Sequence, residues 1–300
     1  MADNHAYFLD KRNSICYNKY MKKRRFGRKI KIGLAFGGGG SRGVSHIGVV
    51  KAFEEYGLDF DYICGTSVGS VIGCAYANGM KSDELISLAK SLKVKDIKTN
   101  KIFFMPSKTD GLEKLITDNL GDINIENLKK PFSVIAVDMK STNQVCISHG
   151  NLAKAVASSC CVPGIFNPVE FGDKLFCDGG LQNNIPANIP RYFGCDYVIA
   201  VDCNRTRTYG TKSSKVVDIL GATIRILMKS NSVKGYVCSD VMIASDNKRF
   251  KSTRLDGIDE MIEEGYKNAI DAMPKIMAIF NGKVKRKKIK DFDKDEIEFI

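Results

Sequence analysis

Residues 64–70 read Cys-Gly-Thr-Ser-Val-Gly-Ser, which places a serine between two glycines in the order G-x-S-x-G. The apolar run before it, 60–64, predicts a buried strand, and the small residues from 68 to 77 predict a tightly packed helix. Gly65 and Gly69 allow strand and helix to approach closely, while Ser67 is held in a strained turn with its hydroxyl exposed. The pattern predicts a serine nucleophile, although an ordinary glycine turn with a solvated serine would read the same.

A second glycine-rich loop follows the apolar run 31–36. It reads Gly-Gly-Gly-Gly-Ser-Arg-Gly over 37–43 and leads into a helix-like stretch, 44–56. Successive glycines leave backbone amides uncovered, so such a loop at a helix N-terminus can hold an anion. Two chemistries could use it: a phosphate or dinucleotide site, because Gly38, Gly40 and Gly43 fit G-x-G-x-x-G, or an oxyanion hole for acyl transfer.

The surrounding sequence disfavours the nucleotide interpretation. A dinucleotide site needs an acidic residue at the end of the second strand, whereas Asp59 and Asp61 precede that strand. A P-loop needs Gly-Lys-Ser/Thr where this chain has Gly43-Val44-Ser45. No Cys/His cluster has zinc-ligand spacing. We therefore expect an oxyanion hole, no cofactor and no metal.

The histidines do not supply an ordinary catalytic triad. The chain has three, His5, His46 and His149, and in α/β-hydrolases the catalytic histidine follows the acid, late in the chain. We expect His46 to be a hydrogen-bonded structural residue beneath the glycine loop, and His149 to lie at a strand-to-loop boundary. These positions direct the search for a general base to the carboxylates.

Three aspartates follow apolar runs: Asp138, Asp178 and Asp202. For Asp138 and Asp202 we expect turn hydrogen bonds at strand ends. Asp178 differs because Gly179 and Gly180 follow it, which lets the backbone turn sharply and leaves room next to the carboxylate.

Three blocks in this order, 37–43, 65–69 and 178–180, resemble the signature of the patatin-like phospholipase family, most closely its small bacterial members. The resemblance runs from about residue 31 to about residue 280. It implies a Ser-Asp dyad that cleaves carboxylic acyl esters of phospholipids or lysophospholipids. The implied site consists of the nucleophile Ser67 with elbow residues Gly65 and Gly69, the base Asp178 with Gly179 and Gly180, the oxyanion hole Gly38, Gly39 and Gly40, and the loop-supporting Arg42 and Gly43.

Two alternatives to hydrolysis stay open. An acyltransferase would use the same acyl-enzyme and deliver it to an alcohol. A non-enzymatic lipid-binding protein would retain only the fold, and the intact serine, aspartate and glycine loop disfavour this alternative.

The apolar runs alternate with helix-like stretches, which predicts a three-layer α/β/α fold with a mainly parallel central sheet. Right-handed crossovers would place the loops of Gly38 and Ser67, and that of Asp178, at one sheet edge. The expected strands are 31–36, 60–64, 132–137, 174–177 and 196–201.

Charge separates the ends from the middle of this 300-residue chain, whose formal net charge is +12. We expect a basic N-terminal extension at 1–30, a catalytic domain at 31–280 and a charged tail at 281–300. Scattered cysteines and the lack of a signal peptide or an apolar span predict a cytoplasmic protein. The basic ends suggest either plain solubility or peripheral contact with an anionic membrane at its inner face. No nucleic-acid motif accompanies the charge.

Overall fold

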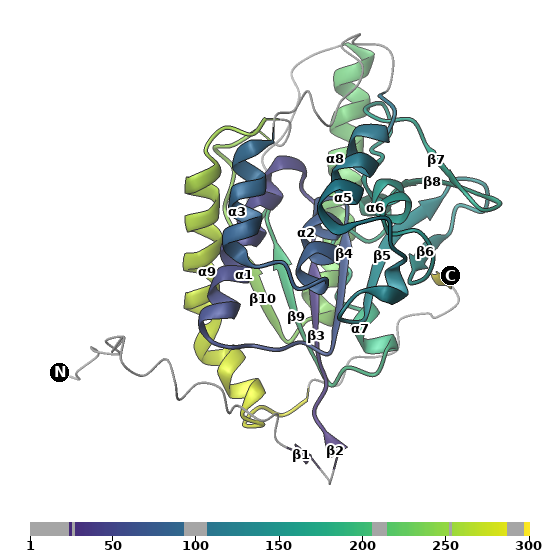
Figure 1. Cartoon of the computed structure of the whole chain (residues 1–300). Helices are drawn as coiled ribbons and strands as arrows, with labels where there is room; N and C mark the ends of the chain where they lie inside the picture. Colours follow the sequence, from purple (N-terminus) through teal and green to yellow (C-terminus); the bar gives the residue numbers. More distant parts are fainter. Residues whose placement is uncertain (1–23, 26–27, 93–106, 206–214, 252–253, 287–296) are drawn as a thin grey trace.

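The expected apolar runs form the centre of a sheet that helices cover on both faces (Figure 1). The computed structural model describes residues 24–25, 28–92, 107–205, 215–251, 254–286 and 297–300. Every residue of the first three central strands is buried, as expected for strands covered on both sides. These strands are β3 (Ile32–Phe36), β4 (Tyr62–Thr66) and β5 (Phe132–Asp138).

Within the described residues the main sheet has nine strands, in the order β10-β9-β3-β4-β5-β6-β11, with β8 paired to β5 and β7 to β8. The pairs from β10 to β5 are parallel, which confirms the mainly parallel prediction. The other strands are β6 (Gln144–Ile147), β7 (Val169–Phe171), β8 (Lys174–Asp178), β9 (Tyr197–Asp202), β10 (Val241–Ala244) and β11 (Ile297–Phe299).

The side chains of successive strand residues alternate between two separate hydrophobic cores. Leu34 and Phe36 of β3 pack in the larger core, whereas Ala35 between them packs in the smaller one. The larger core takes side chains from α1 (Ser45–Glu55), α2 (Val68–Ala77), α3 (Ser82–Ser91), α5 (Asp110–Leu120), α6 (Leu152–Cys160) and α9 (Ile258–Phe280). The smaller core takes them from α7 (Ile189–Tyr192) and α8 (Val216–Cys238). The three-layer prediction is therefore confirmed.

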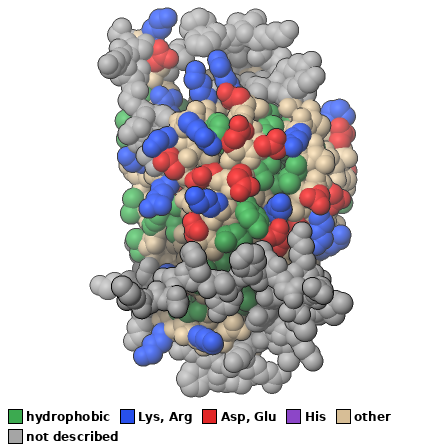
Figure 2. Space-filling model, turned by 90° about the vertical axis from the view of Figure 1, so that its left-hand side faces the viewer, with side chains coloured by type: hydrophobic (Ala, Val, Ile, Leu, Met, Phe, Trp, Pro, Cys, Tyr) green, Lys and Arg blue, Asp and Glu red, His purple; other side chains and the backbone are tan. Residues whose placement is uncertain are grey.

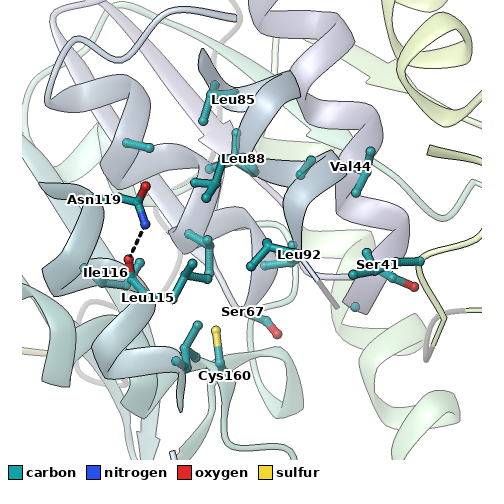
Figure 3. Close-up of a pocket in the computed structure, with 18 of the residues that line it drawn as sticks. Ser41, Val44, Ser67, Leu85, Leu88, Leu92, Leu115, Ile116, Asn119 and Cys160 are labelled. Atoms are coloured by element: carbon teal, nitrogen blue, oxygen red, sulfur yellow. Dashed lines mark hydrogen bonds between the residues drawn. The ribbon is translucent and has the colours of Figure 1, made fainter. Parts of the chain in front are cut away.

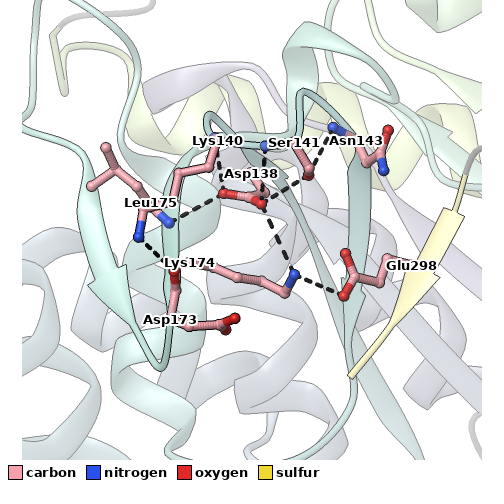
Figure 4. A network of polar contacts seen from close by, with 8 residues as sticks. All are labelled: Asp138, Lys140, Ser141, Asn143, Asp173, Lys174, Leu175 and Glu298. Atoms are coloured by element: carbon pink, nitrogen blue, oxygen red, sulfur yellow. Dashed lines mark hydrogen bonds and ion pairs between the residues drawn. The ribbon is translucent and has the colours of Figure 1, made fainter.

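Asp138, at the end of β5, has the structural role expected for it. Its carboxylate accepts hydrogen bonds from the backbone N–H groups of Lys140 and Leu175 and from the hydroxyl of Ser141 (Figure 4). The Lys174 ammonium lies 3.9 Å from this carboxylate and 2.7 Å from that of Glu298. Part of the segment that the sequence set apart as a charged tail thus returns to the sheet, since Glu298 belongs to β11, the strand paired with β6.

The two ends of the parallel strands differ in their surroundings. A short hairpin of β1 (Arg24–Arg25) and β2 (Arg28–Lys29) precedes the start of β3, at the bottom of Figure 1. The glycine loop follows the opposite end of β3, about 17 Å away at 3.3 Å per strand residue. No helix in the described ranges is long and apolar enough to span a membrane.

Candidate active site

Ser67 occupies a strained turn between β4 and α2. Its φ of 52° and ψ of −130° lie in a region that non-glycine residues rarely adopt. A Cβ on Gly65 would lie 2.3 Å from the carbonyl oxygen of Gly69, and a Cβ on Gly69 would lie 2.3 Å from that of Phe36. The predicted reason for the G-x-S-x-G spacing, close approach of strand and helix, is therefore confirmed.

Two other serines hold this turn in place. The hydroxyl of the fully buried Ser159, on α6, accepts a 2.7 Å hydrogen bond from the Ser67 N–H and donates to the carbonyl oxygen of Ile135. The hydroxyl of Ser70 donates to the Ser67 carbonyl at 2.6 Å. Sequence reasoning missed Ser159, because a serine inside an apolar helix has no pattern that reveals its partner.

The strand that carries Asp178 to Ser67 does not run in the direction we expected. It does not follow a parallel strand, because β8 runs antiparallel to β5. Thr66 pairs with Ile135, and Asp178 pairs with the next residue, Ala136, on the side of β5 opposite β6. Strands β4 and β8 therefore run toward each other along one edge of β5, and the turn at Ser67 meets the end of β8.

The Asp178 carboxyl is fully buried. Its Oδ1 accepts a 2.7 Å hydrogen bond from the Gly180 N–H, whereas Oδ2 accepts no hydrogen bond of normal geometry from the described residues. Burial raises the pKa of Asp178 to about 6, against the opposing effects of the Gly180 N–H and the Ser67 hydroxyl. A buried carboxylate with one unsatisfied oxygen beside a serine hydroxyl can accept its proton.

The three glycines expected to form the oxyanion hole differ in whether their backbone N–H groups are available to a substrate. The Gly38 N–H already donates to the carbonyl of Asn184 at 2.9 Å, so it is not available to a substrate in this conformation. Gly38 instead provides space, because a Cβ there would lie 3.2 Å from the Ser67 Cβ. Within the described residues, Gly39 and Gly40 donate no backbone hydrogen bond. The candidate oxyanion donors are thereby narrowed to the amides of Gly39 and Gly40.

Arg42 holds the glycine loop, as the resemblance implied. Its guanidinium is buried and donates to the carbonyl of Phe250 and, at 2.9 Å, to the side-chain oxygen of Asn204. The Asn204 amide in turn donates to the Gly38 carbonyl at 3.1 Å. Gly43 allows the loop to pack on α2, because a Cβ there would overlap the side chain of Val68.

Close packing also explains the glycine that follows Asp178, since a Cβ on Gly179 would lie 2.1 Å from the carbonyl oxygen of Ile135.

The remaining strand-end aspartate is Asp202. Its carboxylate accepts the expected turn hydrogen bond from the Asn204 N–H, at 2.8 Å.

Neither described histidine belongs to the site. The ring of His46 is fully buried, and its Nε2 lies 2.8 Å from the carbonyl oxygen of Gly37, which confirms the structural role predicted beneath the loop. Burial lowers the pKa of His46 to about 4. His149 is exposed just after β6 and contacts the hydroxyl of its neighbour Ser148. His5 lies outside the described residues.

An apolar cavity of about 250 Å³ leads away from Ser67 between the helices of the larger core. In Figure 3 Ser67 lies near Cys160 in the lower part of the residues drawn, and Leu85 of α3 lies at the top. The polar side chains on its wall are those of Ser41, Ser67 and Asn119. Most of the remaining wall is apolar, with Val71, Ile72, Ala75, Met80, Leu85, Leu88, Leu92, Leu112, Leu115, Ile116, Leu120, Val162, Ile165 and Phe166.

Known proteins share this arrangement of elements. The patatin-like phospholipase family profile matches residues 34–191, which is more than half of the chain and contains both Ser67 and Asp178. The crystal structure of VipD from Legionella pneumophila has the same fold, with a TM-score of 0.55 and 15% identity over 84% of this chain and 67% of that one. The chain belongs to the patatin-like phospholipase family.

Sequence relatives are longer proteins. An uncharacterized NTE family protein of Mycobacterium tuberculosis is 33% identical over 189 residues, 62% of this chain and 32% of that protein. Neuropathy target esterase sws of Drosophila melanogaster is 31% identical over 57% of this chain and 13% of its own length. For lysophospholipase NTE1 of Saccharomyces cerevisiae the identity is 31%, over 62% of this chain and 11% of that protein. The chain thus spans a third or less of these relatives.

Proposed function

We propose that this protein is a serine hydrolase of lipid acyl esters, with Ser67 as nucleophile and Asp178 as general base. The observation that carries the proposal is the meeting of a strained serine, which lines an apolar cavity, with a fully buried carboxyl. The relatives named as an esterase and a lysophospholipase support the same chemistry.

The reaction begins when Ser67 Oγ attacks the ester carbonyl carbon and its proton passes to Oδ2 of Asp178. The N-terminus of α2 and the amides of Gly39 and Gly40 stabilise the charge on the carbonyl oxygen. Collapse of the tetrahedral intermediate breaks the ester C–O bond, and Asp178 returns the proton to the leaving alcohol. Water then attacks the acyl-enzyme and gives a proton to Asp178. Collapse of this second intermediate breaks the ester C–O bond to Ser67, whose Oγ takes the proton back from Asp178 as the fatty acid leaves.

The cavity favours a substrate with a long acyl chain. Its wall is mostly apolar, so burial of an alkyl chain there is favourable at about 0.8 kcal/mol per methylene. We propose phospholipids or lysophospholipids as substrates, with one acyl chain in the cavity and the head group outside.

Contact of the basic ends with an anionic membrane stays a prediction, as does a cytoplasmic location. The hairpin of β1 and β2, which belongs to the basic N-terminal extension, lies at the end of the parallel strands opposite the glycine loop (Figure 1). Attraction through this hairpin would therefore not by itself bring Ser67 and Asp178, which lie toward the other end of the strands, to a lipid surface.

The proposal is tested by incubating the full chain with phosphatidylcholine, lysophosphatidylcholine and p-nitrophenyl butyrate. We expect fatty acid or nitrophenol release by the wild type and a loss on the order of a thousandfold or more in Ser67→Ala. Ser158→Ala is the matched control, because its buried hydroxyl donates to the Lys154 carbonyl and makes no contact with the Ser67 turn. Equal hydrolysis by wild type and Ser67→Ala would refute the proposal.

A further inference from the structure

Helix α8 exposes an unusual amount of apolar surface. Of the eleven large hydrophobic side chains exposed in the described part of the chain, eight lie on this one helix. Val216 is 70% exposed, and Ile226 and Val233 are each 61% exposed. A surface helix normally turns polar residues to solvent, and a contiguous apolar patch marks a binding surface. The eight residues are Val216, Ile219, Leu220, Ile226, Leu227, Val233, Tyr236 and Val237.

Seven of these side chains form one stripe, because they recur at helical spacings of three, four and seven residues. We call Val216, Ile219, Leu220, Ile226, Leu227, Val233 and Val237 the apolar stripe. The opposite side of α8 packs on the protein, where Gly235 contacts Ile185 and Met228 contacts Gly180. Tyr236 is not part of the stripe, since its hydroxyl donates to the Asp202 carboxylate at 2.8 Å.

The inner side of α8 is hydrogen-bonded to residues next to the candidate active site. Ser232 accepts a 3.1 Å hydrogen bond from the side-chain amide of Asn184, the residue whose carbonyl binds the Gly38 N–H. The Asn231 amide donates to the carbonyl of Leu181, three residues after Asp178. In Figure 1 the N-terminal half of α8 extends beyond the strand ends, on the side where β3 and β4 end. A surface that covered the apolar stripe would therefore lie beside the site.

The charges on α8 favour an anionic partner. Together with its N-cap Lys215, the helix carries Arg225, Lys229 and Lys234 against the single acidic residue Asp218. Apolar side chains combined with Lys and Arg are typical of helices that lie in the headgroup region of anionic bilayers.

The face that carries α9 is different. Figure 2 shows basic and acidic side chains intermixed on it, and the exposed residues of α9 include Asp259, Glu260 and Glu263. A face with both charge signs is well solvated and gives no reason for a lipid surface to bind there.

We propose that α8 is an interfacial helix whose apolar stripe inserts into the headgroup–acyl boundary of an anionic bilayer. Insertion would place the Ser67–Asp178 site next to its lipid substrate. The proposed function enters here only as the reason for choosing a lipid surface as occupant. Insertion itself requires no catalysis.

Vesicle cosedimentation of the full chain carrying Ser67→Ala tests the proposal without hydrolysis of the vesicles. The vesicles are phosphatidylcholine alone or with one quarter phosphatidylglycerol. We expect preferential binding to the anionic vesicles and at least a tenfold weaker partition for Ile226→Ser/Leu227→Ser. Thr223→Val, which fills an exposed polar position within the stripe between Leu220 and Ile226, should strengthen binding. Failure of lipid hydrolysis in wild type would leave these binding results unchanged, so the two proposals fail separately.

Two controls separate insertion of α8 from misfolding and from binding through the basic N-terminal extension. With Ser67 intact, Ile226→Ser/Leu227→Ser should hydrolyse p-nitrophenyl butyrate as the wild type does, which reports a folded site. Deletion of residues 1–29 should reduce only the salt-sensitive part of binding, because charge attraction is screened while apolar insertion is not. Equal vesicle binding by wild type, Ile226→Ser/Leu227→Ser and Thr223→Val would overturn the proposal. A wild-type dimer that the double substitution converts to monomer, with vesicle binding unchanged, would overturn it in favour of a second copy.

Discussion

Ser67 and Asp178 come together where β4 and β8, running in opposite directions along the same edge of β5, meet end to end. Thr66, the residue before Ser67, pairs with Ile135, and Asp178 pairs with the adjacent residue Ala136. The strand register therefore brings Ser67 and Asp178 together. Because β5 is fully buried in the centre of the sheet, the relative position of the two residues is held by backbone hydrogen bonds. This rigidity favours a two-residue mechanism, in which no third side chain orients the base.

Replacing Asp178 with asparagine should abolish activity and stabilise the fold at neutral pH. The amide cannot accept the Ser67 proton. The Asp178 pKa of about 6 lies above the unfolded value, so the folded protein binds the extra proton and loses stability as the pH rises from about 4 to about 6. Removing this buried charge should increase the unfolding free energy at pH 7 by on the order of 2–3 kcal/mol. Thermal and urea unfolding at pH 5 and pH 7 measure it, and a destabilised Asp178→Asn at pH 7 would contradict the buried-charge interpretation.

The pH dependence of hydrolysis should follow the same carboxyl. With a soluble short-chain ester, kcat/KM should fall about tenfold per pH unit below an apparent pKa near 6, because only ionised Asp178 accepts the proton. A His149→Ala protein should retain this profile, since that imidazole is exposed outside the site. A loss of the acid limb in His149→Ala, with a normal fold, would assign the base to histidine instead.

Ser159→Ala should weaken catalysis by loosening the elbow. The substitution leaves the Ser67 N–H and the Ile135 carbonyl without their buried partner, which costs about 1–3 kcal/mol of stability. We expect kcat to fall about tenfold with little change in KM, as for a residue that positions the nucleophile. Ser158→Ala is the matched control, because its hydroxyl is equally buried on the same helix but donates only to the Lys154 carbonyl. Equal kinetics in the two variants would mean that Ser159 has no positioning role.

Phenylalanine substitutions along α2 should shorten the acyl chain that the enzyme prefers. Val71 and Ala75 line the cavity four and eight residues beyond Ser67, or about 6 and 12 Å along the helix. Val71→Phe should exclude all but short chains, whereas Ala75→Phe should exclude only the longest. Hydrolysis of p-nitrophenyl esters from acetate to palmitate measures this, with acetate turnover as the internal control. Unchanged chain-length profiles in both variants would place the acyl chain elsewhere.

The local geometry of the elbow could be predicted from sequence because small residues leave few alternatives. Helix α2 begins and ends where expected, and the glycines flanking Ser67 have no room for a Cβ. The central strands were also found, since they are continuous apolar runs bounded by turns.

What the sequence did not reveal depends on pairing between distant segments. The antiparallel direction of β8 and the return of β11 to the sheet follow from registers that no local pattern encodes. The hydrogen bond from the Gly38 N–H to Asn184 likewise joins residues far apart in the chain, so four glycines in a row did not show which amides stay available. The exposed stripe of α8 could not be predicted because its spacing is that of an ordinary buried helix.

The most direct test of the dyad is to react the full chain with a fluorophosphonate and identify the modified residue by peptide mass spectrometry, with the rate of labelling. We predict a single adduct on Ser67, formed at the wild-type rate in His149→Ala and at least a hundredfold more slowly in Asp178→Asn. An adduct on another residue, or labelling of Asp178→Asn at the wild-type rate, would contradict the Ser67–Asp178 dyad.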